Sequence, residues 1–123
     1  MAPVDLRERT RLFALAVLKY CRGLPRTDEA QEAARQLRRA ANSLRSNYRA
    51  ARKGRSRAEF TAKLGTASEE ADECVDWIEY LRDGEIRDDP ALLQEANEIS
   101  KIMSTAYRTA KLNNSRPENV RGS

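Results

Sequence analysis

The sequence contains no histidine. Without histidine, the chain cannot form a Ser-His-Asp or Cys-His nucleophile arrangement, or the Glu-x-x-His ligand pairs of di-iron bundles. A glycine-rich phosphate loop is also missing, because RKGRSR at residues 52–57 lacks the required glycine spacing. We therefore expect a protein that is not an enzyme, with no metal, no cofactor and no small-molecule substrate.

Residues that favour β structure or membranes are also scarce. The 123 residues include 5 glycines, 4 prolines and 6% aromatic residues, too few for a β-sandwich or barrel. The longest apolar run, at residues 12–18, is too short to span a bilayer, and no leader pattern is visible. Cys21 and Cys74 are isolated and fall on apolar faces, as small core residues do. We expect a soluble, cytoplasmic protein with no membrane partner.

Helix-forming residues in heptad order make up most of the chain. Three apolar seams have spacings that alternate between four and three residues, as in packed helices. The seam expected over residues 28–53 consists of Ala30, Ala34, Leu37, Ala41, Leu44, Tyr48 and Ala51. The next seam consists of Phe60, Leu64, Ala67, Ala71, Cys74, Ile78 and Leu81. The last consists of Leu92, Ala96, Ile99, Met103, Ala106 and Ala110.

Capping signals divide these seams into separate helices. The predicted N-caps are Asp28 (with Gln31 as its capping-box partner), Ser56 and Asp89, and the predicted terminators are Gly54 and Gly84. Short loops between regular seams predict an all-α fold, a left-handed up-down antiparallel four-helix bundle over residues 1–115. Residues 116–123 carry no seam, and we expect a disordered tail there.

The first helix has two apolar sides. Phe13, Val17, Tyr20 and Leu24 continue a seam, whereas Leu12, Leu15 and Leu18 lie on another side. A helix that is apolar all round is normally buried all round, so the second side predicts contact with another copy of the chain. The alternative is that these leucines are ordinary exposed residues. Trp77 and Tyr80 lie off the seam of their helix and are candidates for the same interface, or for partial surface packing.

Charge is segregated along the chain. No acidic residue occurs between Glu32 and Glu59, whereas ten occur from Glu69 to Asp89. On a helix, five of the cations in the basic window form one stripe, roughly 110° from the apolar seam, and three more continue it across the following turn. This arginine stripe consists of Arg35, Arg38, Arg45, Arg49, Arg52, Lys53, Arg55 and Arg57. Arginine, which outnumbers lysine 18 to 5, suits phosphate and base recognition.

Two interpretations of the arginine stripe remain open. In the first, the stripe follows a nucleic-acid backbone, and binding falls steeply with salt. In the second, it pairs with the acidic face of the third helix, within one chain or between copies. Duplex base readout is not expected, because a bundle helix flanked by neighbours cannot enter a groove.

Four short segments of the predicted helices form a pattern that is less generic than an alanine-leucine seam. The segments are Arg39-Ala40-Ala41-x-Ser43, Asn47-Tyr48-Arg49-x-Ala51, Ser56-x-x-Glu59-Phe60, and Glu70-Ala71-Asp72-Glu73 leading to Trp77. With these segments the chain resembles the family of bacterial four-helix-bundle proteins encoded in 23S ribosomal RNA intervening sequences, also called S23 proteins. The likeness spans about residues 5–112. The position after Asn47-Tyr48-Arg49, commonly glutamate in the family, is Ala50 here.

The resemblance implies an up-down bundle that assembles into a pentameric ring. It also implies kinship with the accessory variability protein of diversity-generating retroelements, a similar pentamer that binds nucleic acid and a reverse transcriptase. Residues and resemblance together favour a homo-oligomer that binds structured RNA, alone or with a protein partner, through the arginine stripe. The alternative is a protein-interaction scaffold whose charged faces serve assembly only.

Overall fold

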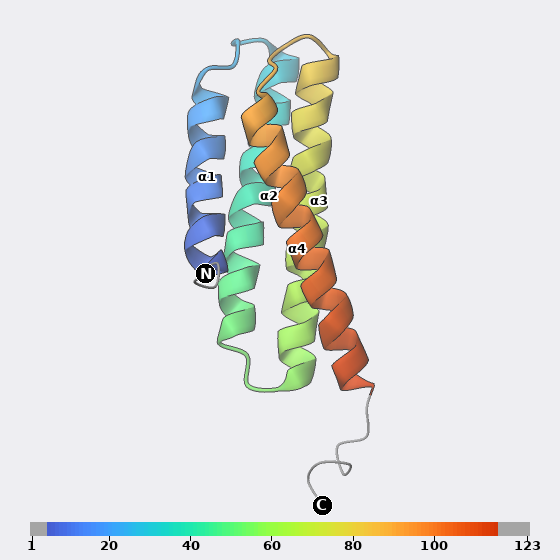
Figure 1. Cartoon of the computed structure of the whole chain (residues 1–123). Helices are drawn as coiled ribbons and strands as arrows, with labels where there is room; N and C mark the ends of the chain where they lie inside the picture. Colours follow the sequence, from blue (N-terminus) through green and yellow to red (C-terminus); the bar gives the residue numbers. More distant parts are fainter. Residues whose placement is uncertain (1–4, 116–123) are drawn as a thin grey trace, which may run out of the picture.

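A computed structural model describes residues 5–115, which form an all-α four-helix bundle (Figure 1). The helices are α1 (Leu6–Arg22), α2 (Asp28–Arg52), α3 (Arg57–Asp83) and α4 (Pro90–Asn114). They alternate in direction, so that both the α1–α2 and the α3–α4 connections lie at one end and the α2–α3 turn lies at the other. The predicted tail at residues 116–123 lies outside the described residues. The left-handed twist and the ring assembly stay predictions.

Two of the three predicted N-caps are confirmed. The Ser56 hydroxyl accepts a hydrogen bond from the backbone N–H of Glu59 at 3.0 Å, at the start of α3. The Asp89 carboxylate accepts one from the backbone N–H of Leu92 at 3.0 Å, and Pro90 follows as the first helical residue. Each cap satisfies a backbone donor that has no partner inside its helix.

The prediction of Asp28 as the cap of α2 is wrong. Thr27 is the cap: its backbone is extended, and its side chain accepts from the backbone N–H of Ala30 at 3.3 Å. Asp28 becomes the first helical residue, where its charge is favourable beside the positive end of the helix dipole. Gln31 donates to the carbonyl of Pro25 at 2.9 Å, so the predicted capping box is not formed.

The three seams form the core, with one exception at an end of the bundle. Every predicted seam residue of α2 is buried, and so are those of α3 after the first. Phe60, the first, is 37% exposed, so its assignment to the core is wrong. Ala106 of α4 is half-buried. Ala33 and Ala40 are buried in addition, because α2 packs against α1 as well as α3 and needs a wider apolar face.

The short length of α1 explains the exposed end. Helix α1 has 17 residues, whereas α2 and α4 have 25 and α3 has 27. At 1.5 Å per residue, α1 is shorter than α2 and α4 by roughly 12 Å. Around the α2–α3 turn the bundle therefore contains three helices, and nothing among residues 5–115 takes the place of the fourth.

Polar contacts hold α1 to the rest of the bundle. The Arg9 guanidinium pairs with Glu95 at 2.7 Å and with Glu98 at 2.8 Å, which ties α1 to α4. Near the other end of α1, Nη1 of Arg87 donates to the Tyr20 carbonyl at 2.7 Å, and its guanidinium lies 4.7 Å from the centre of the Tyr20 ring. Burial raises the pKa of Tyr20 to about 12.

Candidate nucleic-acid interface

The first and last residues of the arginine stripe have partners inside the bundle. Arg35, near the start of α2, pairs with Glu32 one turn earlier on the same helix. Arg57, the first residue of α3, donates to the carbonyl of Asn113 at the end of α4. These two side chains therefore also have structural roles, at a helix surface and at a helix C-terminus respectively.

Arg39, an arginine outside the stripe, forms ion pairs with two acidic residues of α3. The Arg39 guanidinium lies 3.2 Å from a carboxylate oxygen of Glu70 and 2.6 Å from one of Glu73. The hydrogen bond from Arg39 lowers the pKa of Glu73. The pairing between α2 and α3 that one interpretation assigned to the stripe is thus made by Arg39.

The middle of the stripe has no such partner. Among residues 5–115, no carboxylate forms an ion pair with any of six stripe cations. They are Arg38, Arg45, Arg49, Arg52, Lys53 and Arg55. Four of these side chains are exposed, and those of Arg38 and Arg45 are half-buried. Four of these cations lie on α2, Lys53 caps it and Arg55 follows in the turn. Like charges in such a row repel one another, and no carboxylate of residues 5–115 pairs with them.

The stripe lies on the side of α2 that faces α1. Arg38 acts on the thiol of Cys21 in α1, where it partly offsets the burial that raises the pKa of this cysteine. Arg39, the next residue, points to α3 instead. Helix α1 adds exposed cations of its own, which the sequence analysis did not include: Arg7, Arg11, Lys19 and Arg22. Of these, Arg11 pairs with Glu8.

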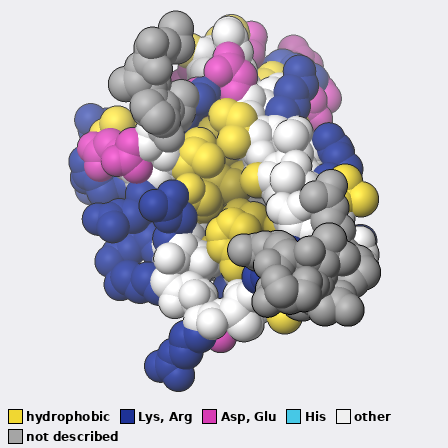
Figure 2. All heavy atoms as spheres, turned by 60° about the horizontal axis from the view of Figure 1, so that its bottom comes forward, with side chains coloured by type: hydrophobic (Ala, Val, Ile, Leu, Met, Phe, Trp, Pro, Cys, Tyr) yellow, Lys and Arg dark blue, Asp and Glu magenta, His cyan; other side chains and the backbone are white. Residues whose placement is uncertain are grey.

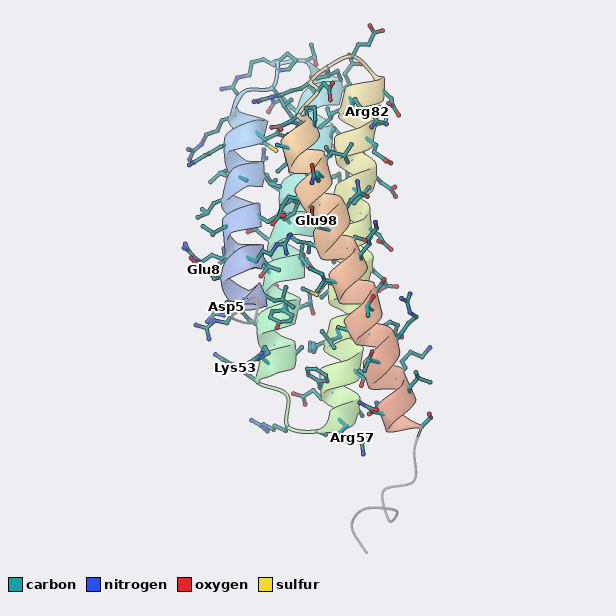
Figure 3. All side chains as sticks on the ribbon, viewed as in Figure 1. Asp5, Glu8, Lys53, Arg57, Arg82 and Glu98 are labelled. Carbon is teal, nitrogen blue, oxygen red and sulfur yellow. The ribbon has the colours of Figure 1, made fainter. Side chains whose placement is uncertain are left out.

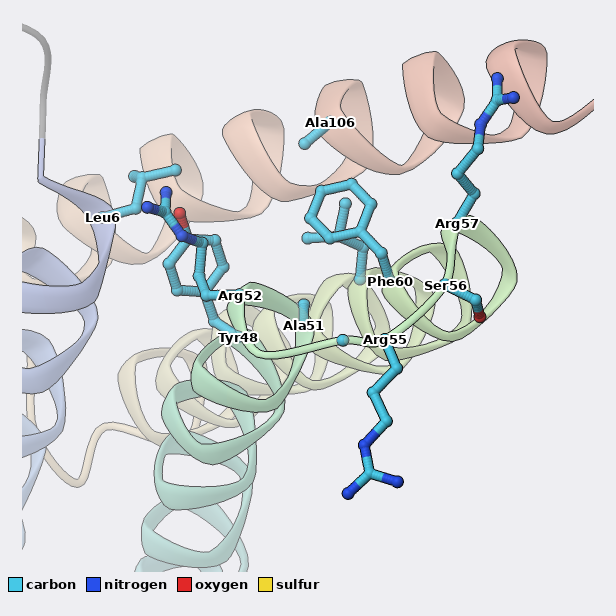
Figure 4. A pocket seen from close by; sticks show the side chains of 11 residues that line it. Leu6, Tyr48, Ala51, Arg52, Arg55, Ser56, Arg57, Phe60 and Ala106 are labelled. Carbon is cyan, nitrogen blue, oxygen red and sulfur yellow. The ribbon is translucent and has the colours of Figure 1, made fainter. Parts of the chain in front are cut away.

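A pocket of about 600 Å³ opens at the end of the stripe. We call it the turn pocket, because it lies beside the α2–α3 turn. Its residues are Leu6, Tyr48, Ala51, Arg52, Gly54, Arg55, Ser56, Arg57, Phe60, Leu64 and Ala106. Figure 4 shows Phe60 reaching from α3 towards Ala106 of α4, with Arg52 beside Tyr48 and Leu6. Viewed from this end, apolar side chains form a patch with Lys and Arg along one side (Figure 2).

Sequence reasoning did not find the turn pocket. It assigned Phe60 to a seam, and it did not compare the lengths of the four helices. That comparison was available, because the apolar pattern of the first helix is visibly shorter than the other three. The pocket also extends the basic surface around the end of the bundle, where Figure 3 places Lys53 and Arg57.

The predicted oligomer-interface residues divide into two surfaces. Leu12 is 52% and Leu15 is 39% exposed on α1, so this helix is not buried all round within a single chain, and Leu18 is half-buried. On α3, Tyr80 is 54% exposed and Trp77 is half-buried; their rings meet edge to face with centroids 5.5 Å apart. Both surfaces remain candidates for contact with another copy.

Within residues 5–115, no group of three or more Cys, Asp or Glu residues could hold a metal ion. No helix in the same range is long and apolar enough to cross a membrane.

Comparison with known proteins agrees with the fold and identifies the family. A crystal structure of a protein with unknown function from the S23 ribosomal protein family of Bacteroides thetaiotaomicron VPI-5482 is similar, with a TM-score of 0.73 and 26% identity over 82% of this chain and 96% of that one. None of the curated proteins matches the chain. The sequence model of the family described as 23S rRNA-intervening sequence protein matches residues 4–106. The chain therefore belongs to the 23S rRNA-intervening sequence protein family.

Proposed function

We propose that this chain is a non-enzymatic, homo-oligomeric bundle that binds structured RNA through the arginine stripe. The observation that carries the proposal is the difference between Arg39 and its neighbours. Acidic residues of α3 are available in number, yet in the described part of the chain two of them, Glu70 and Glu73, pair with Arg39, and none pairs with the six stripe cations. A row of unpaired arginines destabilises the free protein through repulsion, and a phosphate backbone relieves that repulsion.

The shape of the molecule favours binding to structured RNA over recognition of bases in a duplex groove. The stripe lies on a helix flanked by α1 and α3, so it presents a rigid row of cations and cannot insert into a groove. Structured RNA offers phosphates along an irregular surface, together with unpaired bases. Arginine serves both, since its guanidinium is a two-pronged phosphate donor and also stacks on bases.

Self-association completes the proposal. The exposed leucines of α1 form an apolar surface that another copy would bury, and the family resemblance suggests a pentameric ring. In a ring, the stripes of several copies would act together, which raises the affinity for one long RNA above that of a single stripe.

A protein-interaction scaffold is the second candidate, and a specific observation favours it. Beyond the residues that Arg39 uses, Asp76 and the exposed Tyr80 lie with Trp77 around a shallow surface pocket on α3. An aromatic pair beside carboxylates suits a cationic partner, such as the stripe of a neighbouring copy. In this case the stripe would serve assembly and not RNA.

A light-scattering experiment with matched variants separates the two candidates. The wild-type protein is measured with and without a structured ribosomal-RNA fragment at about 50 and 200 mM salt, where phosphate contacts weaken steeply. The test variant is Arg45→Gln/Arg49→Gln. The control is Lys101→Gln/Arg108→Gln, which removes the same charge from exposed positions on α4.

Under the RNA proposal, the wild-type oligomer gains RNA mass at low salt and loses it at high salt. The test variant keeps its oligomer, and the slope of log affinity against log salt falls by about 1.4 to 1.8 for two lost phosphate contacts. The control changes much less. An oligomer that ignores RNA at both salts, and that weakens in the test variant, would establish the scaffold instead.

A further inference from the structure

The turn pocket has a chemistry of its own, distinct from the row of cations that leads to it. Its interior is apolar and aromatic, with Phe60, Leu64 and Ala106 contributed by α3 and α4 and Tyr48 and Ala51 by α2. None of the described residues that line it is acidic. Its volume of about 600 Å³ is in the range of small-ligand sites.

Phe60 is the partly exposed aromatic residue of the pocket. It occupies the first turn of α3 and follows the heptad spacing of the core, yet 37% of it is exposed. Helix α1 is too short to reach this level, so residues 5–115 provide no fourth helix beside the partly exposed Phe60 ring. An exposed aromatic ring beside an apolar cavity offers a flat surface on which another ring can stack.

The cations at the mouth restrict what can occupy the pocket. Arg52 lies beside Tyr48, and Arg55 extends from the turn away from the pocket (Figure 4). Neither forms an ion pair with a carboxylate of residues 5–115. A flat, apolar group carried on a negatively charged backbone matches both features, since the group enters the cavity while its charges stay at the arginines outside.

We propose that the turn pocket takes an unpaired nucleobase of the RNA held by the arginine stripe, with the base stacked on Phe60 and the adjoining phosphates at Arg52 and Arg55. The inference rests on the proposed function, because the stripe brings the backbone to the pocket. An RNA that follows α2 towards its end reaches the α2–α3 turn, where the row of cations and the apolar cavity meet. Single-stranded loops and bulges supply such bases, whereas a closed duplex does not.

A base pocket would give the protein a preference for unpaired RNA, which the arginine stripe alone cannot provide. Phosphate contacts are the same in loops and in duplexes, so they do not distinguish the two. A stacking site admits any base, since every base has an aromatic face, and it therefore selects unpaired structure without selecting sequence.

Fluorescence anisotropy with two RNAs tests the inference. One RNA is a hairpin with an unpaired loop, and the other is a fully paired duplex with the same number of phosphates. The variants are Phe60→Ala and Phe60→Leu, which remove the ring with and without loss of apolar volume. The matched control is Leu112→Ala, an exposed apolar side chain near the end of α4 that is not among the residues lining the turn pocket.

We expect Phe60→Ala to weaken hairpin binding by about tenfold and to leave duplex binding unchanged, as a lost stacking contact would. Phe60→Leu should give a smaller loss of the same kind, and Leu112→Ala none. A 2-aminopurine base placed in the loop should be quenched on binding to the wild-type protein and less quenched with Phe60→Leu. The quenching measurement needs no destabilising variant, because 2-aminopurine reports stacking when the RNA binds the wild-type protein.

Each contrary outcome has a distinct meaning. Equal loss on hairpin and duplex, or no loss on either, overturns the base pocket and leaves RNA binding by the stripe intact. A Phe60 variant that changes the oligomer mass also overturns it, because the pocket would then be covered by a second copy. Failure of the wild-type protein to bind either RNA removes the proposed function itself, and the pocket inference with it.

Discussion

Arginine and large apolar residues occur at both ends of the bundle, but they are bonded or buried at one end and exposed at the other. At the end that carries both the α1–α2 and the α3–α4 connections, Arg87 donates to the Tyr20 carbonyl and covers its ring, and Leu81 is fully buried. At the end that carries the α2–α3 turn, Arg52 and Arg55 have no carboxylate partner in the described chain, and Phe60 is partly exposed.

The difference follows from the length of one helix. At one end four helices enclose the core and Arg87 finds a backbone acceptor, whereas at the other the shorter α1 leaves an apolar pocket lined by Arg52 and Arg55. The closed end contributes stability, and the open end keeps aromatic and cationic groups exposed, where the proposed RNA contacts would form. The proposed site and the most enclosed part of the core thus lie at different ends of one bundle.

The largest expected effect comes from core truncation at the closed end. Leu81→Ala should lower the free energy of unfolding by about 2 to 5 kcal/mol, because it leaves a cavity in a fully enclosed site. Phe60→Ala should cost no more than about 1.5 kcal/mol, since part of the ring already contacts water. Urea unfolding followed by circular dichroism measures both. Equal losses of unfolding free energy in Leu81→Ala and Phe60→Ala would mean that the core is equally enclosed at both ends.

A medium effect on the free energy of unfolding is expected when an arginine that binds inside the bundle is compared with one that has no carboxylate partner among residues 5–115. Arg87→Gln should lower the free energy of unfolding by about 1 to 2 kcal/mol, through loss of the hydrogen bond and the ring contact to Tyr20. Arg55→Gln should change it by less than about 0.5 kcal/mol. Hydrogen exchange should also show weaker protection of α1 in Arg87→Gln alone.

An independent substitution checks the role of Arg87. A Cβ atom at Gly23 would lie 2.3 Å from Nη1 of Arg87, so Gly23→Ala must displace the guanidinium from Tyr20. The backbone of Gly23 has an ordinary helical conformation, and alanine introduces no strain there. Unchanged protection of α1 in Gly23→Ala would argue against a holding role for the Arg87 contact.

The smallest effect on the free energy of unfolding is expected when Arg39 of α2, which forms ion pairs, is compared with Arg45, which forms none with residues 5–115. Arg39→Gln should cost at most about 1 kcal/mol at neutral pH, because the pair is partly exposed. The pKa of Glu73 is lowered below its ordinary 4.5, so the contribution of this pair is present above that pH and is lost as the pH falls through the lowered pKa. The difference from wild type should therefore shrink below pH 4.5.

Arg45→Gln is the control for this pH dependence. Arg45 has no ion pair with a carboxylate of residues 5–115, so the difference between this variant and wild type should stay nearly constant over the same pH range. Thermal unfolding at a series of pH values measures both variants. Parallel curves for Arg39→Gln and Arg45→Gln would show that the contact with Glu73 contributes nothing.

Local sequence signals predicted most of the fold and part of the candidate site. Heptad spacing identified the buried residues of α2, from Ala30 to Ala51, because periodicity alone decides which face of a long helix is apolar. The cap at α2 was misplaced by one residue, since Thr27 and Asp28 are both good caps and only the backbone conformation chooses between them. The spacing placed five stripe arginines on the helix that is α2, but which of them have partners was not predictable.

The amino-acid sequence by itself determined four helices, their apolar faces and the separation of basic from acidic segments. Only the tertiary structure decided which cations are neutralised, because an ion pair depends on a distance of a few ångströms between side chains of different helices. Arg38 and Arg39 are adjacent in the chain, yet Arg39 reaches Glu70 and Glu73 while Arg38 lies beside α1. Tertiary packing likewise left Phe60 exposed, since the length of α1 relative to its neighbours fixes where the four-helix core ends.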